Sequence, residues 1–163
     1  NITFYYYFCQ QLLCHRHIVM LMPMTNEFPD LRRFLKAIDI SEFEQTFPDE
    51  ESCLKVLAEM KWRDGFICRF CGNTHYGKGK KPFTRRCTRC KREESATAHT
   101  IFHHCRIELP KAFEIAWHVC GKPGITGSAL SEMLDTRHMT CLHFRNRIIH
   151  CIEVHRDLTD LQE

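Results

Sequence analysis

The 163-residue sequence contains no uninterrupted apolar run long enough to cross a membrane. Its most apolar segment, residues 1–22, is broken by polar residues between Gln10 and His17, well short of the roughly twenty residues that a spanning helix needs. No small-residue cleavage site follows a basic start, so the segment does not match a secretory signal peptide either. We therefore expect a cytoplasmic protein with no membrane partner.

The sequence also lacks an initiating methionine, whereas Met20, Met22 and Met24 cluster just before the first regular pattern. This arrangement suggests that upstream translation was read into the chain. We expect residues 1–26 to be a weakly ordered apolar leader that is not native to the fold.

Acidic residues are almost missing from residues 61–92, where Asp64 stands against eleven lysines and arginines for a charge of +10. The whole chain carries only +3, because residues 27–60 carry −5, residues 93–163 carry −3 and residues 1–26 carry +1. A basic charge concentrated in this way favours a polyanionic partner. The alternative is a merely solvated face.

Four of the eleven cysteines form two Cys-x-x-Cys pairs, Cys68 with Cys71 and Cys87 with Cys90, with fifteen residues between them. This spacing is typical of two hairpin knuckles that close one tetrahedral metal site. Four unrelated buried cysteines, or two disulfides, are the alternatives. Because all four ligands come from the protein, no position is open for water, and we expect one structural ion. Zinc suits a polar, basic module, although a tetrathiolate site can also hold iron.

The other seven cysteines are scattered, and we expect them to be reduced, buried small residues. They are Cys9, Cys14, Cys53, Cys105, Cys120, Cys141 and Cys151. The run His99, His103, His104 and Cys105 suggests a second metal site, but the segment alternates and is rich in β-formers. Residues 97–107 are therefore expected to form the last strand of the ribbon.

Apolar residues at helical spacing predict three short helices before the ribbon. Asp30 is expected to cap the first, Ser41 the second and Asp49 the third. Three more helices are expected after the ribbon, starting near Pro110, Gly127 and His138.

Two methionines of these last helices, Met133 and Met139, are expected to face the core. The short turn between the last two helices is typical of a helix-turn-helix, although any small helical bundle shows a similar pattern.

The predicted class is α+β, built from small domains: N-terminal helices, a β-hairpin zinc ribbon, then a three-helix helix-turn-helix bundle. The predicted segments are the leader 1–26, a helical segment 27–64, the zinc ribbon 65–108, the helix-turn-helix 109–155 and a linker that begins in 156–163.

Two sequence runs are especially specific: Trp62-Arg-Asp-Gly-Phe-Ile-Cys68 and Thr100-Ile-Phe-His103. With the paired cysteines, they resemble the N-terminal half of insertion-sequence transposases of the zinc-ribbon DDE type, over about residues 47–153. The sequence departs from that pattern at His99 and at Asp135, where the family usually has glycine.

This resemblance implies a nucleoid-associated, DNA-binding protein that holds the terminal repeats of its element. It also implies that catalysis belongs to an RNase H-like domain, in which three acids bind divalent metal, and that this domain is absent from the chain. We accordingly expect no enzymatic activity from this chain alone, and a possible homodimer in the full-length protein.

The residues expected to contact double-stranded DNA fall into two sets. The ribbon should contribute mainly phosphate contacts through Arg69, Lys78, Lys80, Lys81, Arg85, Arg86, Arg89, Lys91 and Arg92. The last helix should reach base edges or the adjacent backbone through Arg137, His138, Thr140, His143, Arg145, Asn146 and Arg147.

Two other binding functions fit the same pattern. One is a transcription regulator built from a ribbon and a helix-turn-helix, and the other is an adaptor whose ribbon grips an acidic protein. A self-contained metalloenzyme fits least, because a closed thiolate site has no room for substrate.

Overall fold

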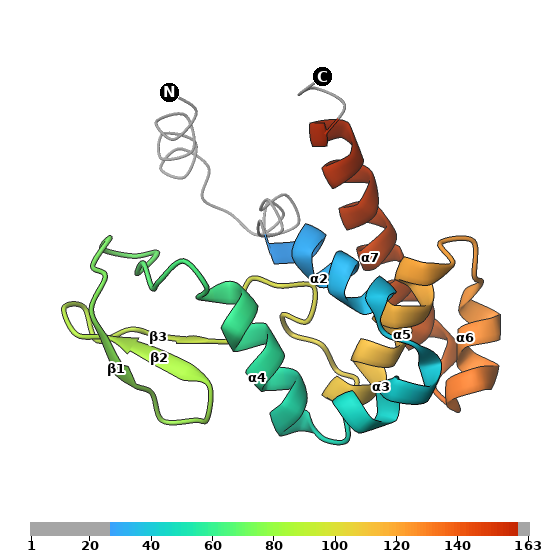
Figure 1. Ribbon diagram of the computed structural model, residues 1–163, viewed down its shortest axis with the longest axis horizontal. Coiled ribbons are helices and arrows are strands. Elements are labelled where there is room, and N and C mark those ends of the chain that lie inside the picture. The colour runs from blue at the N-terminus through green and yellow to red at the C-terminus, as the bar shows by residue number, and fades with distance from the viewer. Residues whose placement is uncertain (1–26, 160–163) are drawn as a thin grey trace.

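The computed structural model describes residues 27–159, with the side chains of residues 28–155. The elements are α2 (Glu27–Ala37), α3 (Ile40–Thr46), α4 (Glu50–Lys61), β1 (Tyr76–Lys78), β2 (Thr84–Cys87), β3 (Glu93–Ser95), α5 (Leu109–Gly121), α6 (Gly127–Leu134) and α7 (His138–Thr159). The fold is mixed α+β, as predicted. A three-stranded antiparallel sheet of order β1-β2-β3 lies at one end of the molecule, and the helices gather beside it (Figure 1).

The predictions for the leader 1–26 and for the end of the 156–163 segment lie outside the described residues. Helix α7 continues to Thr159, past its predicted end at His155. None of the helices in the described part of the chain is long and apolar enough to cross a membrane.

The helix starts show where local sequence signals compete. Asp49 caps α4 as predicted, since its carboxylate accepts the backbone N–H of Ser52 at 2.8 Å. The prediction for the second helix was wrong, because Asp39 rather than Ser41 is the cap and accepts the Ser41 N–H at 3.0 Å. The first helix begins before Asp30, because a proline at position 29 is tolerated in a first turn whose N–H groups have no helical partner.

The helices on either side of the ribbon share one hydrophobic core. Phe47, just after α3, packs against Phe113 of α5 with ring centroids 4.8 Å apart. The indole of Trp117 on α5 donates a 2.9 Å hydrogen bond to the carbonyl of Ile38. The N-terminal helices therefore cover α5 (Figure 1).

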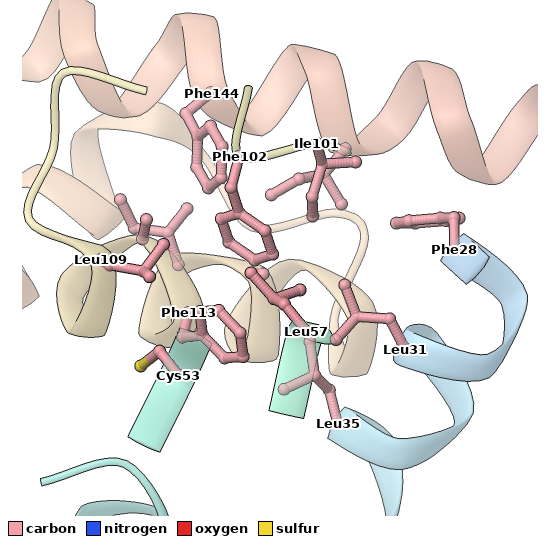
Figure 2. Close-up of a cluster of buried hydrophobic side chains, with 14 of the residues drawn as sticks. Phe28, Leu31, Leu35, Cys53, Leu57, Ile101, Phe102, Leu109, Phe113 and Phe144 are labelled. Carbon is pink, nitrogen blue, oxygen red and sulfur yellow. The ribbon is translucent and has the colours of Figure 1, made fainter. Parts of the chain in front are cut away.

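The segment 97–107 forms successive turns, so the prediction of a last ribbon strand there was wrong; strand β3 is only Glu93–Ser95. Phe102 is drawn into the helical core between Phe113 and Phe144, with ring centroids 4.5 and 5.8 Å away (Figure 2). Both Ile101 and Phe102 are 2% exposed, which an alternating strand with one solvent face would not allow. Burial of these two neighbours decides the local structure.

Helices α6 and α7 are joined by a tight turn at residues 135–137. Asp135 adopts a left-handed conformation with φ of 44° and its N–H bonds to the Ser131 carbonyl, so it fills the position where glycine is usual. A Cβ on Gly127, at the start of α6, would lie 3.2 Å from two side-chain atoms of Leu142. The two helices therefore cross closely at Gly127.

The prediction that Met133 and Met139 face the core was wrong. They are 55% and 47% exposed, on either side of the turn between α6 and α7. The core positions of α7 are instead filled by Cys141, Phe144 and Ile148. These residues recur at helical spacing, and the methionine at 139 lies off their stripe.

Candidate metal centre and nucleic-acid interface

The two Cys-x-x-Cys pairs form knuckles of the same design. In the first, the Gly72 N–H donates to the Cys68 carbonyl at 2.8 Å, and in the second the Lys91 N–H donates to the Cys87 carbonyl at 3.1 Å. The donors have φ values of +70° and 61°, both left-handed. Glycine adopts this conformation freely, whereas Lys91 holds it at some steric cost.

The structure brings the four predicted metal ligands together. Their sulfur atoms all lie within 4.8 Å of one another, with Sγ–Sγ distances of 3.5 Å between Cys68 and Cys90 and between Cys71 and Cys87. A tetrahedron with Zn–S bonds of about 2.3 Å places its sulfurs roughly 3.8 Å apart. All four are free cysteines that lie together, so they are neither two disulfides nor four unrelated residues. The cluster fits one structural zinc.

Hydrogen bonds to sulfur stabilise the thiolate form at one ligand. Burial alone would raise the pKa of Cys87, but backbone N–H groups of Cys90 and Arg89 and the side-chain amide of Asn73 lower the pKa to about 6. The Asn73 amide also donates to the His75 carbonyl at 2.8 Å. Asn73 was not among the predicted site residues, and its only sequence signal is its position two residues after a ligand.

A buried ion pair ties the ribbon to α4. The ammonium of Lys61 lies 2.8 Å from the Glu94 carboxylate, and their side chains are 3% and 10% exposed. The Lys61 ammonium also donates to the carbonyls of Ser95 and Ala98 at 2.9 and 2.6 Å. Arg69, predicted to contact DNA, places its Nε 3.3 Å from the same carboxylate. Two of the eleven basic side chains thus share one carboxylate, which offsets a single positive charge.

Two further arginines of the ribbon lie over aromatic rings. The guanidinium of Arg85 is 4.0 Å from the ring centroid of Tyr76 and 4.3 Å from that of Trp62. The guanidinium of Arg92 is 4.0 Å from the ring centroid of Phe70. These cation–π contacts fix both arginines against the ribbon surface.

The other ribbon residues predicted to contact DNA differ in whether their side chains are bonded within the protein. Arg86 donates through Nε to the Lys91 carbonyl at 3.2 Å, and Lys91 donates through Nζ to the Thr88 carbonyl at 2.5 Å. The side chains of four other bases make no hydrogen bond or ion pair within the described part of the chain: Lys78, Lys80, Lys81 and Arg89. All four are exposed, and the first three lie on the hairpin between β1 and β2.

Two predicted DNA contacts on α7 are engaged within the protein. The guanidinium of Arg145 donates to the carbonyls of Ile125 and, at 3.1 Å, Pro123, and to the Asn146 side-chain oxygen at 3.1 Å. These bonds hold the loop between α5 and α6. Arg147 likewise donates to two carbonyls of the 97–107 segment, each at 2.9 Å.

Other predicted α7 contacts remain on the surface. Arg137, His138, His143 and Asn146 are exposed, and Thr140 is half-buried. Residues 139, 143 and 146 recur at helical spacing, so they form one exposed stripe. On this stripe His143 and Asn146 carry hydrogen-bond donors and acceptors, whereas Arg145 and Arg147 bond loop carbonyls.

The histidines of segment 97–107 lie close together. The rings of His99 and His103 are 5.4 Å apart, those of His103 and His104 are 4.0 Å apart, and His99 has a φ of 61°. Burial lowers the pKa of His99 and of His103. Among residues 27–159, the one group of three or more potential metal ligands that lie close enough together is the four cysteines, so these histidines do not form a second such group.

The sheet, the two knuckles and the four-cysteine cluster define a zinc ribbon. More specifically, residues 48–93 match the family model of the transposase zinc-ribbon domain, of the IS1595 type. The match covers α4, both knuckles and the first two strands. Comparisons with curated proteins and with solved structures gave no match.

The loop-holding role of Arg145 leads to a stability prediction. Arg145→Ala should lower the free energy of unfolding by about 1–3 kcal/mol, because carbonyls of the α5–α6 loop lose a charged donor. Urea unfolding followed by circular dichroism measures the change. Arg137→Ala, which removes an exposed arginine beside the same helix, is the control and should leave the midpoint unchanged. If Arg145→Ala and Arg137→Ala were equally stable, the hydrogen bonds from Arg145 would not stabilise the loop.

Proposed function

We propose that this chain is the DNA-binding part of a transposase and that it recognises the terminal repeats of its element. The observation that carries the proposal is the match to the transposase zinc-ribbon family model. In the matched module, the charged side chains of the hairpin 78–81 are all basic and exposed. A ribbon of this kind supplies a concentrated positive surface, and double-stranded DNA is a concentrated polyanion.

The ribbon's part in this proposal is to hold phosphates. Lys78, Lys80, Lys81 and Arg89 have no internal partner in the described structure, so their charges are available to a ligand. They extend from a three-stranded sheet whose short strands present loops rather than a helix. Such a surface suits sequence-independent backbone contacts, which position the protein on the duplex.

Helices α6 and α7 supply the sequence-reading part of the proposal, as a helix-turn-helix. The tight left-handed turn at Asp135 and the close crossing at Gly127 support this arrangement. The exposed stripe on α7 includes His143 and Asn146, whose side chains can bond base edges in the major groove. Arg145 donates a hydrogen bond to the side-chain oxygen of Asn146, which orients the Asn146 amide.

Catalysis, in this proposal, is not performed by the residues that the structure describes. DNA cleavage and strand transfer would be carried out by a separate RNase H-like unit with its own divalent metals. The working location in this proposal is the nucleoid.

A salt titration tests the phosphate contacts. Lys80→Ala and Arg89→Ala should each weaken binding to any duplex and reduce the slope of log K against log salt by about 0.9, because each removes one neutralised phosphate. Fluorescence anisotropy with terminal-repeat and scrambled duplexes, at several salt concentrations, measures both quantities.

The matched control is Lys36→Ala, which removes an exposed lysine of α2 outside the ribbon. Its salt slope should equal that of the unmodified protein. If all three variants kept the same slope, or if the protein bound no duplex at low salt, the proposed DNA-binding role of the ribbon would be wrong.

A further inference from the structure

The first knuckle exposes two large apolar side chains beside the metal cluster. Ile67 is 66% exposed and Phe70 is 57% exposed, although they flank the buried ligand Cys68. Short knuckles leave these side chains no core to enter, because the strands beside them have three or four residues. Both side chains are therefore accessible to a ligand.

Phe70 already carries a cation on one face of its ring. The Arg92 guanidinium lies 4.0 Å from the ring centroid, yet more than half of Phe70 stays exposed. Much of the Phe70 side chain is therefore still accessible to a ligand. Arg92 belongs to the second knuckle, where its carbonyl accepts the Cys87 N–H at 2.9 Å. The metal cluster thus holds ring and cation together on a rigid base.

The surroundings select the class of ligand. No acidic residue occurs between positions 65 and 92, although Glu93 follows Arg92 directly. Of the bases next to the pair in sequence, Arg69 pairs with Glu94, whereas Lys91 forms no ion pair within the described residues. An exposed aromatic ring beside a guanidinium matches what an unpaired nucleotide offers: a flat base to stack and a phosphate to pair. A base pair inside a duplex presents only its edges, so the ring cannot stack on it.

We propose that Phe70 and Arg92 form a binding site for an unpaired nucleotide, with the base stacked on the Phe70 ring and the phosphate held by Arg92. This inference rests on the proposed nucleic-acid function of the ribbon and extends it from duplex to single strands. Tyr76, 47% exposed with the Arg85 guanidinium 4.0 Å from its ring centroid, is a similar pair on β1 and β2. It offers a place for a second base.

The test compares the zinc-loaded full chain and its variants on a short oligothymidylate and on a blunt duplex. Phe70→Ala should weaken oligothymidylate binding about 5- to 100-fold, as loss of one base–aromatic stack does, and leave duplex binding unchanged. Phe70→Trp should retain single-strand affinity, and Phe70→Leu, which keeps an apolar side chain, should lose it. Quenching of 2-aminopurine placed in the single strand reports the stack directly.

Ile40→Ala is the control, since Ile40 is 54% exposed on α3, outside the ribbon, and its loss should change neither affinity. Zinc content and circular dichroism establish that each variant is folded. The site would be overturned if Phe70→Ala weakened binding to both DNA forms equally, or if Phe70→Leu kept full single-strand affinity. It would also be overturned if Phe70→Ala released a bound polyglutamate peptide while oligothymidylate binding stayed unchanged. If duplex binding is intact and only the Phe70 effect is missing, this inference fails while the proposed function stands.

Discussion

Serine in place of Cys71 or Cys87 is expected to unfold the zinc ribbon. The ribbon's strands are three or four residues long, and Ile101 and Phe102, from the segment predicted to be its last strand, belong to the helical core instead. Zinc binding therefore supplies most of its stability, on the order of 10–16 kcal/mol of apparent folding free energy in such modules.

Metal analysis and NMR measure this result. The unmodified chain should hold one zinc, and the serine variants should lose the dispersed amide signals of residues 65–95 while the helices of residues 109–155 stay folded. Cys105→Ser is the control, because Cys105 is a half-buried cysteine outside the cluster. A chain purified without zinc that kept a dispersed ribbon spectrum would contradict the structural role of the metal.

The second large effect is expected from Glu94→Gln. This change removes the carboxylate that lies 2.8 Å from the ammonium of Lys61, whose side chain is 3% exposed. Breaking a buried ion pair from one side leaves an uncompensated charge, and the expected cost is about 3–5 kcal/mol of unfolding free energy. Denaturant unfolding of the zinc-loaded protein measures it.

Two variants separate this electrostatic cost from a general effect of mutation. Glu93→Gln changes an exposed acid in the same strand and should cost less than about 0.5 kcal/mol. The double variant Lys61→Met/Glu94→Leu should recover much of the loss, because apolar residues of similar size need no countercharge. If Glu94→Gln were as stable as Glu93→Gln, the pair would not tie the ribbon to α4.

The outcomes along the chain show which signals are local. The spacing of four cysteines identified the metal ligands because a knuckle is built from residues i and i+3. The predicted starts at Asp49, near Pro110, near Gly127 and at His138 agree with the structure to within one residue. Caps depend on hydrogen bonds to neighbours two or three residues away, so the sequence carries the signal. Nearby candidates compete, however: Asp39 rather than Ser41 caps α3, and α2 begins before Asp30.

The failures come from competition between segments distant in sequence. Residues 97–107 have the composition of a strand, but burial of Phe102 between Phe113 and Phe144 stabilises a turned path instead. Met133 and Met139 were predicted to face the core as apolar residues of helical patterns, but such a pattern does not say which stripe of a helix meets a neighbour.

The sequence by itself determined that this protein has a zinc ribbon between helices and that its basic charge is concentrated there. Only the tertiary structure decided which charges a ligand can use. Lys61 and Arg69 pair with Glu94, Arg145 holds a loop, and the side chains of Lys78, Lys80 and Lys81 have no partner among the residues that the structure describes. The physical reason is that a count of charges is additive along the chain, whereas pairing depends on distances of a few ångströms between residues far apart in sequence.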